Sequence, residues 1–96
     1  MSHVVALQMQ VQPAKMDAFM SMFLPALDDT RAREGCELVE CYVDEANPNT
    51  VLVWEKWDKP ESQQAYMAWR GETGFIDILG PFMAAAPTFT TYLSQD

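Results

Sequence analysis

Aromatic rings, a phenol and a cation gather in one short stretch of an acidic chain, WDKPESQQAYMAWRGETG. Tyr66, Trp69 and Arg70 are spaced i, i+3 and i+4, so on a helix they share one face, and Gln63 joins them one turn earlier. Rings can wall an apolar ligand, a tyrosine hydroxyl can donate to a phenolate oxygen, and a guanidinium can stabilise its charge. In one interpretation these residues line a site, in which Arg70 stacks on a ring or pairs with an anion.

Packing alone offers a second interpretation of the same residues. Rings on the helix of a small domain mostly fill a core, and Tyr66 and Trp69 would then simply cover a sheet. Arg70 would form a surface ion pair with Glu72 or Asp77, which contributes little to stability. Both interpretations stay open on the residues alone.

Metal and nucleotide chemistry are not expected. His3 is the chain's single histidine, expected to face solvent near the chain start, and no cluster of Cys and His has metal-ligand spacing. No Gly-rich loop of the nucleotide-binding kind occurs either, so we expect no cofactor. Cys36 and Cys41 are five residues apart; on one strand an odd spacing puts them on opposite faces, too far apart for a disulfide.

Composition limits the partners. Ninety-six residues correspond to one domain, 1–96, and 49% of them are hydrophobic. The formal charge of −8, without a basic block, argues against nucleic acid and anionic membranes as partners. The start lacks the features of a signal peptide, and no apolar stretch approaches the roughly 20 residues of a membrane span. We therefore expect a cytoplasmic location.

Alternation of apolar and polar residues predicts four strands, at 3–11, 37–43, 51–57 and 87–93. The middle two form an antiparallel hairpin around the turn DEANPN. The hairpin carries apolar residues on both faces, with Leu52 and Trp54 opposite Val53, so both faces should be covered.

A spacing near 3.6 predicts helices between the strands. The first runs from 14 to about 33 with a kink expected at Pro25. The second starts with a capping box of Asp58 and Glu61, runs to Arg70 and stops at Gly71 and Gly74. Gly80-Pro81 divides the apolar segment that follows into two short helices. The order β-α-β-β-α-β predicts an α+β fold of the ferredoxin-like kind, with a four-stranded antiparallel sheet.

These segments together resemble the antibiotic biosynthesis monooxygenase (ABM) family. The resemblance rests on P-x-K opening the first helix, REGC leading into a strand, and VLVWEKW followed by KPESQQAY. It covers about residues 3–93, and its most specific part is the E-x-W of Glu55 and Trp57. ABM relatives form dimers in which two sheets pack face to face, so the resemblance implies a homodimeric α/β barrel.

The ABM family includes small monooxygenases that oxidise quinol-like or polycyclic aromatics with molecular oxygen and without metal or flavin. The resemblance therefore implies a cofactor-free monooxygenase with a small aromatic substrate and O₂ as partners. The family's tryptophan is matched by Trp57, whereas its usual histidine is Tyr66 here and its usual asparagine is Cys36. The catalytic residues thus carry over only in part, and the base is left unassigned.

We expect Tyr66, Arg70 and Trp57 to carry the chemistry, beside a lining rich in Met. The residues expected to contact substrate come from the two long helices and the short helix after them: Gln63, Trp69, Met20, Phe23 and Phe75. Two alternatives remain. One is heme binding or degradation. Histidine is the commonest iron ligand and the usual histidine is Tyr66 here, but tyrosine can also bind iron. The other is a non-enzymatic dimer that binds a small aromatic, because a fold does not fix an activity.

Overall fold

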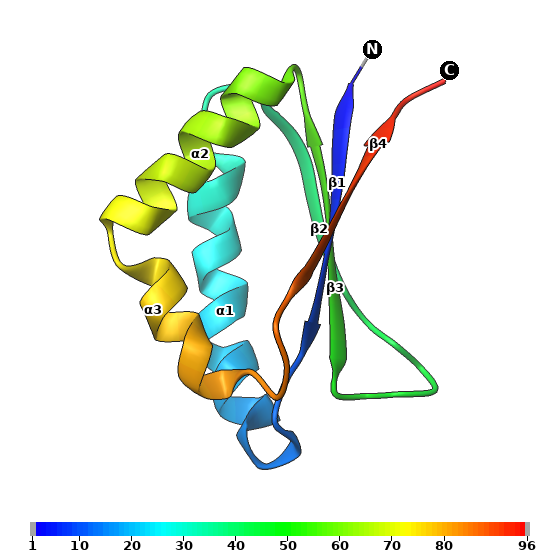
Figure 1. Ribbon diagram of the computed structural model, residues 1–96, viewed down its shortest axis with the longest axis vertical. Helices are drawn as coiled ribbons and strands as arrows, with labels where there is room; N and C mark the ends of the chain where they lie inside the picture. The colour runs from blue at the N-terminus through cyan, green and yellow to red at the C-terminus, as the bar shows by residue number, and fades with distance from the viewer. Residues whose placement is uncertain (1, 96) are drawn as a thin grey trace.

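Four strands form one antiparallel sheet, and the helices cover one side of it (Figure 1). The computed structural model describes residues 2–95. Its elements are β1 (His3–Gln10), η1 (Pro13–Lys15), α1 (Met16–Arg31), β2 (Cys36–Val43), β3 (Thr50–Trp57), α2 (Pro60–Glu72), α3 (Phe75–Leu79), η2 (Gly80–Phe82) and β4 (Thr88–Leu93). The strand order β2-β3-β1-β4 confirms the predicted ferredoxin-like α+β arrangement.

Helix α1 places its apolar face on the sheet. Phe19, Phe23 and Leu27 are buried, as their spacing predicted, and the rings of Phe19 and Phe23 stack with centroids 4.8 Å apart. The helix is uninterrupted across Pro25. It is shorter than predicted at both ends, because residues 13–15 form a 3₁₀ turn and Arg31 is its last helical residue.

The start of α2 differs from the predicted capping box. The N-cap is Lys59, in extended conformation, and no side chain caps the helix. Asp58 instead accepts a hydrogen bond from the Ser62 hydroxyl at 2.6 Å. Gly35 lies against this pair with φ of 85°, and a Cβ there would collide with Ser62 and Asp58. The Asp58 backbone N–H donates to the Gly35 carbonyl at 2.8 Å, so the backbone of Asp58 joins the turn before β2 to the start of α2, while its carboxylate binds Ser62 instead of capping the helix.

The end of α2 lies between the two predicted stop residues, Gly71 and Gly74. Gly71 is helical, and the helix continues to Glu72. The chain turns at Gly74, whose φ of 77° is left-handed and favours glycine. After this turn the chain enters α3 and η2, from which Phe75, Leu79 and Phe82 pack against the core.

A β-bulge overturns the predicted orientation of the two cysteines. Cys36 lies opposite Trp57 and Cys41 opposite Val53, with a register shift between Cys36 and Leu38. The extra residue changes the parity, so both cysteines lie on the face of the sheet that packs on the helices. Both are free thiols, as predicted.

The two faces of the sheet have different surroundings. On β3, Val51, Val53, Glu55 and Trp57 are buried beneath the helices. The opposite face, formed in part by the residues between them, has no helix over it (Figure 1). There Trp54 packs against Tyr92, with ring centroids 5.7 Å apart, and Tyr92 is 47% exposed. We call this the open face of the sheet. Among residues 2–95, no helix has the length and apolar character needed to cross a membrane.

Candidate active site

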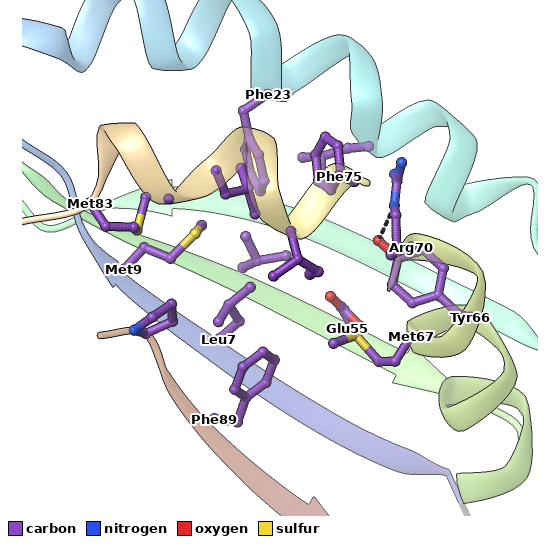
Figure 2. Close-up of a pocket in the computed structure, with 16 residues that line it drawn as sticks. Leu7, Met9, Phe23, Glu55, Tyr66, Met67, Arg70, Phe75, Met83 and Phe89 are labelled. Carbon is purple, nitrogen blue, oxygen red and sulfur yellow. Dashed lines mark hydrogen bonds between the residues drawn. The ribbon is translucent and has the colours of Figure 1, made fainter. Parts of the chain in front are cut away.

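An apolar cavity of about 410 Å³ lies between the sheet and the helices (Figure 2). This volume is within the usual range for small-molecule sites. Three of the lining side chains are polar or charged: Glu55, Tyr66 and Arg70. The others are apolar side chains and one glycine: Leu7, Met9, Phe23, Leu27, Val53, Met67, Phe75, Ile76, Leu79, Gly80, Met83, Pro87 and Phe89. The polar groups gather at one end (Figure 2).

Arg70 is a buried cation and not a surface ion-pair partner. Its side chain is 5% exposed, and its guanidinium donates from Nε to the Tyr66 hydroxyl at 2.9 Å. Nη2 donates to the carbonyl of Ala26 at 2.7 Å and to Thr30 at 3.1 Å. The guanidinium also lies 4.1 Å from the ring centroid of Phe75. The alternative ion pair with Glu72 or Asp77 is therefore wrong.

No carboxylate of residues 2–95 forms an ion pair with Arg70. Within residues 2–95, the one ion pair with an N–O distance of 4.0 Å or less joins Arg31 to Asp28. Neutral oxygens and ring faces hold the guanidinium in place without neutralising it. A cation with this environment, in a cavity with few polar groups, can attract an anionic oxygen of a ligand more strongly than it could in water.

Tyr66 is bonded to the same network. Its hydroxyl lies 2.8 Å from the Thr30 hydroxyl, and either group can be the donor. Thr30 is fully buried on α1, so the contact joins the two helices. Because Arg70 already donates to the Tyr66 oxygen, the Tyr66 proton is free for a ligand only when Thr30 donates to Tyr66. The tyrosine therefore positions Arg70 in either arrangement and can bind a ligand oxygen in one of them.

Glu55 is the polar residue that β3 contributes to the cavity. It is 6% exposed, and its Oε1 accepts a hydrogen bond from Trp57 Nε1 at 2.9 Å. Burial raises the pKa of the Glu55 carboxyl above its ordinary value, while the Trp57 hydrogen bond and the charge of Arg70 act in the opposite direction. The carboxyl thus binds a proton more readily than an exposed glutamate does.

The structure divides the residues predicted for the site. Tyr66, Arg70, Phe23 and Phe75 line the cavity. Four others do not border it: Trp57, Trp69, Gln63 and Met20. Trp57 is fully buried behind Tyr66, with ring centroids 5.2 Å apart. Trp69 lies between two guanidiniums, those of Arg33 and Arg70, each 4.8 Å from its ring centroid.

Sequence reasoning did not select Glu55 or Thr30 as site residues. Glu55 lies between Val53 and Trp57 on the same face of β3, where the neighbouring side chains are apolar. Its position in the sequence therefore already indicated a buried carboxylate. Thr30 follows Leu27 by three residues on the buried face of α1, a spacing that places its hydroxyl inside. Strand and helix periodicity could therefore have identified both residues.

Other reactive groups lie outside the lining. Cys36 packs beside Trp57, and its thiol pKa is raised, first by burial and second by the negative charge of Glu55. His3 is half-buried at the start of β1 rather than fully exposed, and it does not line the cavity. Across the described residues, no three His, Cys, Asp or Glu side chains are grouped closely enough to hold a metal ion.

Solved structures share this fold. A conserved protein from Methanosarcina mazei Go1 aligns with a TM-score of 0.89 at 20% identity, over 98% of this chain and 93% of that one. A candidate antibiotic biosynthesis monooxygenase from Deinococcus radiodurans aligns with a TM-score of 0.88, at the same identity and coverage. Rv0793 from Mycobacterium tuberculosis aligns with a TM-score of 0.85 at 15% identity, over 100% of this chain and 97% of that one. At these identities the likeness concerns the fold alone.

The sequence itself gives the family. No curated protein matches it significantly. The family model for antibiotic biosynthesis monooxygenases, however, matches residues 2–79, which include β1 to α3 and most residues of the cavity. The chain belongs to the antibiotic biosynthesis monooxygenase family.

Proposed function

We propose that this protein is a cofactor-free monooxygenase that inserts one atom of O₂ into a quinol or hydroxylated polycyclic aromatic. The observation that carries the proposal is the cavity, whose walls are apolar except for Glu55, Tyr66 and Arg70 at one end. A flat aromatic body suits the apolar walls, and an ionisable hydroxyl suits the polar end. Membership of the family supports the same chemistry.

The reaction balances without an external reductant. A 1,4-diol and O₂ give a hydroxyquinone and water, because the aromatic supplies both the electrons and the hydrogens that leave with the second oxygen atom. The protein must favour the deprotonated, electron-rich form of the substrate. A buried guanidinium near the substrate oxygen stabilises that anion, and a cavity of low polarity strengthens the interaction.

The proposal is tested by following oxygen uptake with naphthalene-1,4-diol in the presence of a metal chelator, against the rate without protein. Two tryptophan substitutions on α3 provide a matched pair. Leu79 lines the cavity, whereas Ile78 is its neighbour in sequence, 50% exposed and outside the lining. Leu79→Trp should reduce uptake at least about tenfold by filling the cavity, and Ile78→Trp should not. Equal loss in both, or no uptake by the wild-type protein, would count against an enzyme acting in this cavity.

We further propose that the open face of the sheet packs on the same face of a second copy. Trp54 and the half-exposed rings of Tyr42 and Tyr92 lie on that face, and exposed apolar patches of this kind commonly mark interfaces. Light scattering should then give twice the 10.9 kDa chain mass. Trp54→Glu should produce the monomer, and a wild-type mass equal to one chain would rule the assembly out.

A further inference from the structure

Glu55 has one carboxyl oxygen bound and one free. Oε1 accepts the Trp57 hydrogen bond, while Oε2 has no hydrogen-bond partner among residues 2–95. Every fully enclosed side-chain nitrogen or oxygen in that part of the chain does have a partner, so Oε2 must be reachable from the cavity. Figure 2 shows the carboxyl directed into the cavity from β3. The hydrogen bond to Oε1 fixes the position of the carboxyl group, and Oε2 is left open to a ligand. This is the geometry of a proton acceptor.

Among the groups around Glu55, none is better suited to accept a proton. Arg70 and Tyr66 face it from α2, and Cys36 is its titratable neighbour on β2. Its cross-strand partners, Val5 on β1 and Val39 on β2, are apolar. Arginine stays protonated in proteins, so among these groups the carboxyl is best suited to accept a proton at neutral pH.

We propose that Glu55 is the general base of the reaction, with Oε2 accepting the hydroxyl proton of the substrate and Trp57 acting as a positioning residue. The inference rests on the proposed function. In the first step the substrate O–H bond breaks and the Glu55 O–H bond forms, which leaves a substrate anion beside Arg70 and involves no oxidation. After O₂ has added to the ring carbon, Glu55 returns the proton to the distal peroxide oxygen. The C–H bond at the same carbon and the O–O bond then break, the C–H electron pair forms the new carbonyl, and the released proton joins the departing hydroxide as water. The base is thereby restored, and O₂ remains the sole oxidant.

This assignment also orients the substrate. The ionising hydroxyl lies at the end formed by Glu55 and Arg70, so the rest of the molecule extends toward Met9, Met83 and Phe89 (Figure 2). Those positions offer no hydrogen-bonding side chain. The substrate class is therefore an aromatic with its reactive hydroxyls on one terminal ring and an apolar body beyond that ring, rather than one with hydroxyls around its whole perimeter.

The test compares Glu55→Gln with the wild-type protein. Glutamine keeps the size and can still accept the Trp57 hydrogen bond, but it cannot take a proton. The kcat with naphthalene-1,4-diol should fall by about 10²–10⁴-fold, the range for losing a general base, while KM changes little. The rise of kcat/KM with pH, set in the wild type by a carboxyl titrating above the ordinary glutamate range, should disappear. Glu45→Gln, a change of the same kind in the exposed loop before β3, is the control.

Trp57→Phe tests positioning separately. It keeps an aromatic ring but removes the Nε1 donor that lowers the pKa of Glu55. The kcat should fall less than in Glu55→Gln, and the inflection of the pH profile should move to higher pH. An unmoved inflection would mean that Trp57 acts in packing alone.

Binding of 4-nitro-1-naphthol, at a pH low enough that the free naphthol keeps its proton, provides a readout that needs no turnover. In the wild-type protein its binding should produce a carboxylic-acid band in the infrared difference spectrum, and Glu55→Gln should lack that band. Normal turnover by Glu55→Gln with an unchanged pH profile would overturn the base assignment and leave oxygenation standing. The infrared band without oxygen uptake would instead support Glu55 as the acceptor and overturn the proposed function.

Discussion

The two ends of the cavity are built in opposite ways. At the polar end, Glu55, Tyr66 and Arg70 are each at least 93% buried and each hydrogen-bonded to a neighbouring side chain. At the apolar end, Met9 is fully buried but Phe89 is 51% exposed on the edge strand β4. The first end holds charged groups in fixed positions, and the second presents adaptable or partly open surface. We infer that the polar end determines the chemistry and the apolar end determines which aromatic fits.

The polar end is also where we expect stability and function to be coupled. Hydrogen bonds from Arg70 and Tyr66 reach Ala26 and Thr30 on α1, so the network that aims the guanidinium also joins α1 to α2. A buried charge is tolerated only when its donors are satisfied. Substitutions at this end should therefore affect both turnover and folding, whereas those at the apolar end should affect binding alone.

Arg70→Ala should have the largest combined effect of the changes at this end. Turnover of naphthalene-1,4-diol should fall by about 10²–10³-fold, because the cation that stabilises the anion is lost. The free energy of unfolding should fall by roughly 1.5–3 kcal/mol, since hydrogen bonds from a charged donor are removed. Oxygen uptake and urea unfolding measure the two losses.

Arg70→Lys serves as the control for that change, because it keeps the charge but not the fork of donors. It should recover part of the turnover and little of the stability. If Arg70→Ala is as active and as stable as the wild type, the polar end does not have the role assigned to it.

Tyr66→Phe should have a smaller effect. It removes the hydroxyl that lies between Thr30 and Arg70, so stability should fall by about 1–3 kcal/mol as these buried partners lose a bond. Turnover should fall by roughly tenfold through misplacement of the guanidinium. Tyr92→Phe, which changes a half-exposed tyrosine on the open face, should leave turnover unchanged. Equal effects of the two substitutions would remove the distinction between the regions.

Glu55→Gln sharpens the comparison through stability and pH. The pKa of Glu55 is raised by burial, so the folded state binds a proton more tightly than the unfolded chain does. Wild-type stability should therefore decrease as pH rises from the ordinary glutamate value through the raised one, and then level off. The variant should be more stable than the wild type at neutral pH, and this difference should vanish in acid. If the stability curves of the wild type and the variant run parallel across that pH window, the pKa of the Glu55 carboxyl is not raised.

Phe89→Ala should have the smallest effect. The ring is half exposed, so its loss should cost a ligand about 1 kcal/mol or less, a change in KM of roughly fivefold at most with kcat unchanged. Leu93→Ala, on the same strand but outside the cavity lining, is the matched control. A large fall in kcat for Phe89→Ala would show that the apolar end takes part in the chemistry.

Most of the fold follows from periodicity in the sequence. Alternation placed Val53 and Trp57 on one face of β3, and helical spacing placed Phe19 and Phe23 on the core side of α1. The bulge near Cys36 could not be predicted, because the residue types around it do not reveal the extra residue in the strand. That residue nevertheless changes which face of the sheet Cys36 occupies relative to Cys41.

The site was predictable in part. Spacing brought Tyr66 and Arg70 to one helix face. The other two acceptors of Arg70, Ala26 and Thr30, lie on α1, 44 and 40 residues away in sequence, and no local pattern reveals them. The alternation along β3 places Trp57 on the face toward the helices. Its place behind Tyr66, however, depends on how α2 packs on β3. Contacts between elements thus decide whether a predicted residue lines the cavity or supports one that does.

The most direct test of the central claim is the fate of labelled oxygen. The chelator-treated protein would be supplied with ¹⁸O₂ and naphthalene-1,4-diol, and the quinone product analysed by mass spectrometry. A cofactor-free monooxygenase should place one labelled atom in each hydroxyquinone and the other in water, at a rate that Glu55→Gln and Arg70→Ala both reduce. Unlabelled quinone formed together with hydrogen peroxide, or a product yield equal to that without protein, would contradict the account.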